Sequence, residues 1–192
     1  IDFAKQIEEA GADALEINIL ALQSDVLYKY GSFEQRHIDI LSHIKRVVKL
    51  PVIMKLGDNL TNPIALIDQL YANGAAAVVL FNRFYQPDID IEKMVHSSGD
   101  VFSHSSDLSN TLRWIGIASA LVNRIDYAAS GGVHKPEAIV KAILAGASAV
   151  EVCSAIYQNT NLFIGELTRF LSTWMDNKGF KNISQPFLST RK

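Results

Sequence analysis

A short phrase that recurs three times constrains the fold of this chain more than any other feature. Gly11-Ala12-Asp13-Ala14-Leu15 returns as Gly74-Ala75-Ala76-Ala77-Val78 and again as Gly146-Ala147-Ser148-Ala149-Val150. Each copy follows a segment whose apolar residues have helical spacing and precedes a short apolar run. The phrase therefore predicts the end of a helix and the start of a strand. A repeated helix-to-strand unit is typical of a parallel sheet.

Five short segments have the apolar composition expected of strands that are buried on both faces. The predicted strands are Ala14–Asn18, Val52–Lys55, the segment that ends at Asn82, Ile125–Ala129 and Ala149–Val152. This pattern predicts an α/β fold, a TIM (β/α)₈ barrel of which the chain holds about five of the eight parallel strands. No linker-like composition interrupts residues 1–192, so we expect a single domain, the C-terminal portion of a barrel that lacks its first strands.

Two less regular features complete the expected architecture. The pattern loosens between Arg83 and Ser109, where Ile89, Ile91, Val101 and Phe102 form a candidate hairpin. His37 and His43 fall on a predicted helix, and we expect both to be exposed. The histidines have no spacing typical of a metal site, so the sequence predicts no metal.

The last two predicted strands each end in a turn of small residues. Ser130-Gly131-Gly132 follows one strand, and Cys153-Ser154-Ala155 follows the next. Turns without bulky side chains let backbone N–H groups approach a ligand, and the final strands of a barrel hold phosphate in this way. We therefore predict a phosphate site there, the alternative being two ordinary tight turns. Cys153 is expected to be a small packing residue.

Polar side chains stand where three other strands are predicted to end. Lys55 is the most informative, because an unpaired buried ammonium group is costly and so implies a role for its charge. Lys55 could offset negative charge on a ligand, act as an amine nucleophile with a lowered pKa, or extend to the rim. Asn18 and Asn82 each offer donors and an acceptor that suit a flat polar heterocycle, or they cap loops.

Composition excludes several other classes of protein. The net charge is −2 and no basic stripe is present, which argues against a nucleic-acid partner. No apolar run approaches the roughly 20 residues of a membrane span, and residues 1–10 do not have the pattern of a signal peptide. The only cysteine is Cys153, which fits a reducing compartment. We therefore expect a cytoplasmic protein that acts on a small molecule.

These segments together resemble the dihydroorotate dehydrogenase family. The resemblance rests on five motifs that occur in the family's order: Leu15-Glu16-Ile17-Asn18-Ile19, Pro51-Val52-Ile53-Met54-Lys55-Leu56, the strand ending in Asn82, Ser130-Gly131-Gly132-Val133 and Val152-Cys153-Ser154-Ala155. It covers nearly the whole chain, matched to the C-terminal two-thirds of the family. It implies an FMN-binding barrel that oxidises dihydroorotate to orotate in pyrimidine biosynthesis.

The resemblance also implies roles for individual residues. Lys55 would lie beside the flavin ring and support its anionic reduced form, and Asn18 and Asn82 would contact the pyrimidine. The two turns would hold the flavin phosphate, with ligands from Ser130, Gly131, Gly132, Cys153, Ser154 and Ala155.

The chain departs from the family pattern at the catalytic base. Ala21 stands where the family has a cysteine or serine, and Ser24 is the nearest hydroxyl that a shifted loop would bring into reach. The glycine-rich segment of the family is replaced by Ser103-His104-Ser105-Ser106-Asp107, and the N-terminal strands with a second flavin lysine are absent.

Two other functions compete with a flavin oxidoreductase. One is a phosphate-binding lyase or isomerase that uses Lys55 as a Schiff-base amine, and the other is an inactive barrel fragment. Because an incomplete barrel leaves open strand edges, we also expect a homo-oligomer or an additional N-terminal segment to cover them.

Overall fold

The computed structural model describes residues 2–184 and has the predicted α/β architecture. Within these residues, five parallel strands form one sheet in the order β1-β2-β3-β6-β7. The strands are β1 (Leu15–Asn18), β2 (Val52–Gly57), β3 (Ala77–Asn82), β6 (Asp126–Ser130) and β7 (Ala149–Glu151). All five lie where the sequence predicts them, with ends that shift by one or two residues. Lys55 is not the last residue of its strand, because β2 continues to Gly57.

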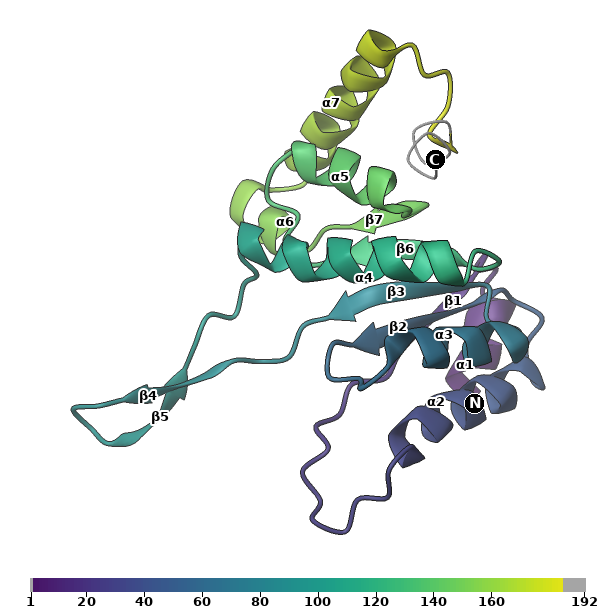
Figure 1. Cartoon of the computed structure of the whole chain (residues 1–192), viewed down its shortest axis with the longest axis vertical. Helices are drawn as coiled ribbons and strands as arrows, with labels where there is room; N and C mark the ends of the chain where they lie inside the picture. Colours follow the sequence, from purple (N-terminus) through teal and green to yellow (C-terminus); the bar gives the residue numbers. More distant parts are fainter. Residues whose placement is uncertain (1, 185–192) are drawn as a thin grey trace.

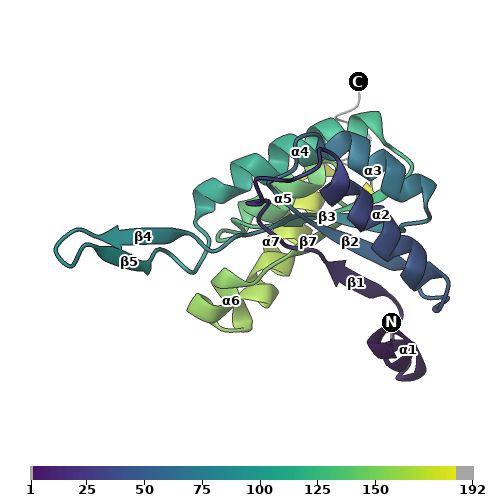
Figure 2. The same ribbon diagram turned by 90° about the horizontal axis from the view of Figure 1, so that it is seen from below.

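Helices cover one face of this sheet. The helices are α1 (Asp2–Glu9), α2 (Ser32–Lys45), α3 (Pro63–Ala72), α4 (Leu108–Leu121), α5 (Glu137–Ala145), α6 (Ser154–Asn159) and α7 (Leu162–Lys178), with a 3₁₀ turn at Ser105–Asp107. Helices α2 to α5 lie along the same face of the sheet (Figures 1 and 2). The right-handed βα repeat places consecutive helices side by side, as in the wall of a barrel.

The strands show which face is which. In β2, Val52, Met54 and Leu56 are buried beneath the helices, whereas Ile53 and Lys55 alternate with them and are only partly buried. Successive side chains of a strand point to opposite faces, so Lys55 lies on the face that the helices leave free. This free face corresponds to the interior of a barrel.

The irregular segment contains a hairpin, but not the one expected. Strands β4 (Pro87–Asp90) and β5 (Val95–Ser98) pair antiparallel and project away from the body of the molecule (Figures 1 and 2). Ile89 is in β4 as expected. Ile91 lies in the turn, and Val101 and Phe102 follow β5, so their predicted place in the strands is wrong. The polar strand residues of β5 gave no apolar alternation to detect.

The two helical histidines differ in environment. His43 is exposed as expected, but His37 is fully buried, so its predicted exposure is wrong. Its Nδ1 lies 2.8 Å from the carbonyl oxygen of Phe33, and its ring packs edge-on against the Phe33 ring. Burial lowers the pKa of His37, which keeps the ring neutral in the core.

We expect a protein of these residues to self-associate. Within the described residues, β1 and β7 each pair with one neighbour only, and such edges present unpaired N–H and C=O groups. Ile91 and Met94 of the hairpin are 80% and 85% exposed, which adds apolar surface. Sedimentation velocity should therefore show dimers or larger species. A monodisperse monomer of 21.2 kDa would contradict this expectation.

The double variant Ile91→Lys/Met94→Lys separates the two surfaces in the same measurement. Association that disappears in the variant is mediated by the hairpin, and association that remains is mediated by the strand edges.

Candidate functional site

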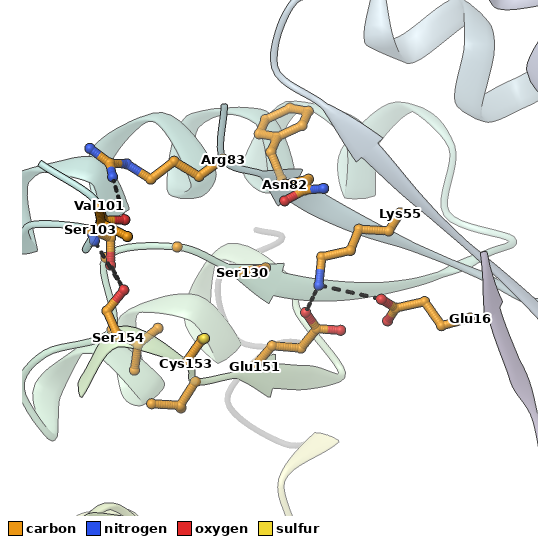
Figure 3. A pocket seen from close by; sticks show the side chains of 15 residues that line it. Glu16, Lys55, Asn82, Arg83, Val101, Ser103, Ser130, Glu151, Cys153 and Ser154 are labelled. Carbon is orange, nitrogen blue, oxygen red and sulfur yellow. Dashed lines mark hydrogen bonds and ion pairs between the residues drawn. The ribbon is translucent and has the colours of Figure 1, made fainter. Parts of the chain in front are cut away.

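A cavity of about 610 Å³, lined in part by charged and hydroxyl side chains, lies at the carboxyl ends of the parallel strands. Figure 3 shows that its side chains come from strands far apart in the sequence. Seven residues predicted from the sequence line it: Lys55, Asn82, Ser130, Gly131, Gly132, Cys153 and Ser154. No site role was predicted from the sequence for the remaining lining residues, which are Glu16, Phe81, Arg83, Val101, Ser103, Val133, Glu151 and Val152.

Three predicted site residues are not part of this lining among residues 2–184. The side-chain oxygen of Asn18 accepts a 2.7 Å hydrogen bond from the amide of Asn82, so Asn18 positions a lining residue. Ala155 is buried against the α7 side of the core, with 1% of its surface exposed. Ser24 is exposed in the irregular segment after β1, and the structure does not bring it to the cavity.

One end of the cavity is rich in hydroxyl groups. The backbone N–H of Ser103 donates to the hydroxyl of Ser154 over 3.0 Å, and the two hydroxyl oxygens are 3.1 Å apart. The Ser103 hydroxyl also lies 2.9 Å from Nε2 of His134. Ser103 belongs to the segment that replaces the family's glycine-rich run. The chain thus has serine hydroxyls in the segment where the family has glycines.

The two glycines after β6 have different reasons to be glycine. Both have positive φ, +103° at Gly131 and +75° at Gly132, a conformation that side chains strain. A Cβ at Gly132 would lie 2.2 Å from the backbone nitrogen of Leu108, so this glycine lets the turn pack against the start of α4. A Cβ at Gly131 would meet nothing closer than 3.7 Å, an ordinary van der Waals contact, so only the positive φ of this cavity-lining residue favours glycine.

Arg83 holds the wall of the cavity opposite the glycine turn. Its Nη1 donates to three successive backbone carbonyls, those of Asp100, Val101 and Phe102, at 2.9, 3.2 and 3.0 Å. Its Nε lies 3.5 Å from a carboxylate oxygen of Asp107. Arg83 therefore fixes the segment that leads into Ser103.

The other end of the cavity contains one ammonium group between two carboxylates. Nζ of Lys55 lies 2.5 Å from Glu151 and 3.3 Å from Glu16 (Figure 3). Strands β2 and β7 are separated by β3 and β6, a distance of about 14 Å in a flat sheet. The contact indicates that the sheet curves and its inner side chains converge, as in a barrel. We call Glu16, Lys55 and Glu151 the lysine–carboxylate cluster.

The three groups shift one another's protonation. Burial acts to lower the pKa of Lys55, but the hydrogen bond and charge of Glu151 and the charge of Glu16 outweigh burial and raise it. Burial raises the pKa of Glu16, and the adjacent Glu151 carboxyl raises it further. Burial also opposes ionisation of Glu151, but hydrogen bonds with Glu16 and Lys55 hold its pKa below the ordinary value.

This environment corrects one interpretation of Lys55. A Schiff-base amine needs a lowered pKa, so that the neutral amine is present to attack a carbonyl. Lys55 has a raised pKa and two carboxylate partners, so it remains a charged, hydrogen-bonded ammonium group. The ion pairs of Lys55 therefore do not favour the lyase or isomerase mechanism, which needs a neutral amine.

No site role was predicted for Glu16 or Glu151, although the sequence contains a signal for both. Glu16 and Glu151 are charged residues inside short apolar strands, as Lys55 is. Three such residues at the same end of a parallel sheet are candidates for mutual pairing, because a lone charge there would be costly. No local sequence pattern predicts the contacts of Arg83 or Ser103, because their partners lie in other segments of the chain.

The fold and cavity are those of part of a parallel α/β barrel, with hydroxyl groups at one end of the cavity and a charged cluster at the other. No family model matches the chain. No helix among residues 2–184 has the length and apolar character to cross a membrane.

Comparison with known proteins gives one consistent answer. The chain is 29% identical to the catalytic subunit of dihydroorotate dehydrogenase B (NAD(+)) from Thermoplasma volcanium, over 94% of the chain and 60% of the relative. It is 30% identical to the subunit of the same name from Methanocella arvoryzae, over 89% of the chain and 58% of the relative. The chain spans about 60% of the length of these curated relatives. The resemblance to dihydroorotate dehydrogenase predicted from the sequence is confirmed.

A solved structure supports the fold independently. The crystal structure of DHODH from Eimeria tenella, a complex with ferulenol, superimposes with a TM-score of 0.72 at 16% identity. The match covers 97% of this chain and 56% of that one. The predicted fold class, a part of a TIM barrel, is therefore confirmed.

The two glycines provide a test of the local packing. Gly131→Ala and Gly132→Ala share the strain of positive φ, but only Gly132→Ala forces a Cβ into the backbone of Leu108. Overpacking of this kind costs about 1–3 kcal/mol beyond the shared strain. Urea denaturation should show Gly132→Ala to be the less stable variant by that amount. Equal stabilities would contradict the packing described. Substitution of Gly132 consequently does not isolate ligand binding from folding.

Proposed function

We propose that this chain forms the FMN and substrate site of an oxidoreductase that resembles dihydroorotate dehydrogenase and oxidises dihydroorotate to orotate in pyrimidine biosynthesis. The proposal rests on the names of the curated relatives and on the polarity of the cavity. The single observation that carries it is that both small-residue turns and Lys55 line one cavity of ligand size.

The hydroxyl-rich end fits a phosphate group. Gly131 and Gly132 line it without side chains, and the hydroxyls of Ser103 and Ser154 lie within hydrogen-bond distance of each other. Hydroxyl and backbone N–H donors are the groups that bind phosphate in neutral sites. Ser130, Cys153 and Ala155 belong to the same two turns and are proposed to support this cradle.

The charged end fits a flavin ring and its substrate. FMN supplies the hydride acceptor when bound, and the protein orients it and tunes it electrostatically. Lys55 presents its ammonium group to this part of the cavity, held in place by its two carboxylates. Asn82 is oriented by Asn18 and presents polar atoms to the pyrimidine of the substrate.

Proton removal is the step for which the loop after β1 is poorly equipped. The side chain of Ala21 has no group that accepts a proton, and its backbone carbonyl accepts a hydrogen bond from the side-chain amide of Asn59. The proposed substitute Ser24 is exposed and belongs to the same segment. This protein should therefore keep the flavin site but oxidise dihydroorotate slowly.

Flavin binding tests the phosphate assignment. Ser154→Ala removes a hydroxyl from the cradle, and a hydrogen bond to a charged group contributes about 1.5–3 kcal/mol. The dissociation constant of FMN should rise roughly 10-fold to 100-fold, whereas that of riboflavin, which has no phosphate, should not change. Fluorescence quenching of each flavin measures both constants.

Ser172→Ala, an exposed serine of α7, is the matched control for this measurement and should bind FMN normally. A parent protein that binds FMN and riboflavin equally well would contradict the phosphate cradle. A protein that binds neither would contradict the proposed function.

Restoring a base tests the chemistry. A positioned base contributes about 10²–10⁴-fold to a proton transfer, so Ala21→Cys should raise the rate of dihydroorotate oxidation within this range. Ser24→Ala should lower the parent rate only if the shifted loop supplies the base. Steady-state assays with a dye acceptor measure all three proteins. A parent that is as fast as Ala21→Cys, and unaffected by Ser24→Ala, would refute both the missing base and its substitute.

A further inference from the structure

The lysine–carboxylate cluster contains more negative than positive charge. With all three groups ionised, one ammonium faces two carboxylates and the net charge is −1. Both carboxylates contact the same ammonium nitrogen, Glu151 at 2.5 Å and Glu16 at 3.3 Å, so one proton on either of them makes the cluster neutral. All three residues line the cavity, and their side chains are 17% to 35% exposed, so they are partly shielded from water.

An ammonium group in this setting cannot offset further negative charge by itself. Lys55 already donates to Glu151 and contacts Glu16, so its charge is neutralised before any ligand enters. A negative charge that develops beside the cluster would meet a group of the same sign, and like charges favour protonation. The site therefore needs a proton to accommodate an anion.

We propose that the lysine–carboxylate cluster takes up one proton when a flavin bound in the cavity is reduced, and that a carboxylate of the cluster, Glu16 or Glu151, carries this proton beside Lys55. The inference rests on the proposed function, because it requires the ring to lie at the charged end of the cavity. It makes Glu151 a positioning residue that links the redox state of the ring to protonation of the protein.

The additional proton is carried by the cluster itself and not by other side chains nearby. Glu16 comes from β1, Lys55 from β2 and Glu151 from β7, and Ser130 on β6 contributes to the lowered pKa of Glu151. Arg83 and Cys153 are the remaining charged or titratable side chains of the described cavity lining. Arg83 is engaged by three carbonyls and Asp107.

Reduction of the ring is coupled to the uptake of two protons. Two electrons and one proton convert the oxidised ring to its reduced anion, and a second proton binds to the cluster. The whole protein thus takes up two protons for two electrons. With dihydroorotate as reductant, the hydride provides the two electrons and the first proton, and the second comes from solvent or from the substrate's adjacent carbon.

The direction of the pH dependence follows from Glu16. Burial and the neighbouring carboxylate already raise the pKa of Glu16 above its ordinary value, and an adjacent reduced ring raises it again. Between the pKa of the oxidised state and that of the reduced state, reduction binds the additional proton. Below this interval the cluster is protonated in both states, and above it in neither.

The experiment is a potentiometric titration of the FMN-loaded protein at a series of pH values from about 5 to 8, with redox dyes. The parent should show two protons per two electrons over part of this range. Glu151→Gln and Glu16→Gln should each halve the slope to one proton per two electrons, because the remaining carboxylate pairs with Lys55 alone. Glu166→Gln on α7 is the control for loss of one exposed carboxylate and should keep the parent slope.

A second measurement follows the protons directly. Reduction of the bound flavin in weakly buffered solution with a pH indicator should take up one more proton in the parent than in Glu151→Gln. A parent that takes up one proton throughout this pH range, or variants identical to it, would overturn the inference. Failure of the protein to bind FMN would instead overturn the proposed function, so the two failures are distinguishable.

Discussion

The contact between Lys55 and Glu151 is the interaction on which the rest of the site depends. It joins strands that have two others between them in the sheet, and it forms on the face that the helices leave free. Val52, Met54 and Leu56 pack under the helices on one face of the sheet, and the charged side chains converge on the other face. Packing on one face and electrostatics on the other therefore favour the same curvature.

The cavity has two chemically distinct ends. The glycine turn and the hydroxyls of Ser103 and Ser154 form one end, which offers donors to an anion. The lysine–carboxylate cluster forms the other, where one ammonium group faces two carboxylates. A ligand with a phosphate at one terminus and a redox-active ring at the other matches this arrangement better than a ligand with uniform charge does.

The sequence predicted the elements that depend on local pattern. Each strand of the parallel sheet is a short apolar run, three of the five follow a glycine that ends a helix, and such signals lie within a few residues of one another. The two turns and Lys55 could be predicted because small residues and a lysine stand out against apolar strands. Both signals lie at the edge of the sheet where the cavity is found.

The parts that the sequence did not predict depend on contacts between distant residues. Lys55 and Glu151 are 96 positions apart, and the curvature that joins them is a property of the whole sheet. The correct charge state of Lys55 followed only from its partners, which is why an amine nucleophile remained an option until the carboxylates were located. His37 was misjudged for a related reason, because helical position alone does not show which neighbours cover a side chain.

The anchoring of the β4–β5 hairpin has a consequence for how this molecule can vary. Arg83 holds the carbonyls of residues 100–102, and the N–H of Gly99 donates to the carbonyl of Gln86 over 3.0 Å. The excursion is thus closed at its base, and the strands beyond that closure make no contribution to the lining of the cavity described here. The β4–β5 hairpin can therefore be replaced without changing the cavity lining. Its length and surface can diverge between homologues, or be exchanged by grafting, while Ser103 keeps its place.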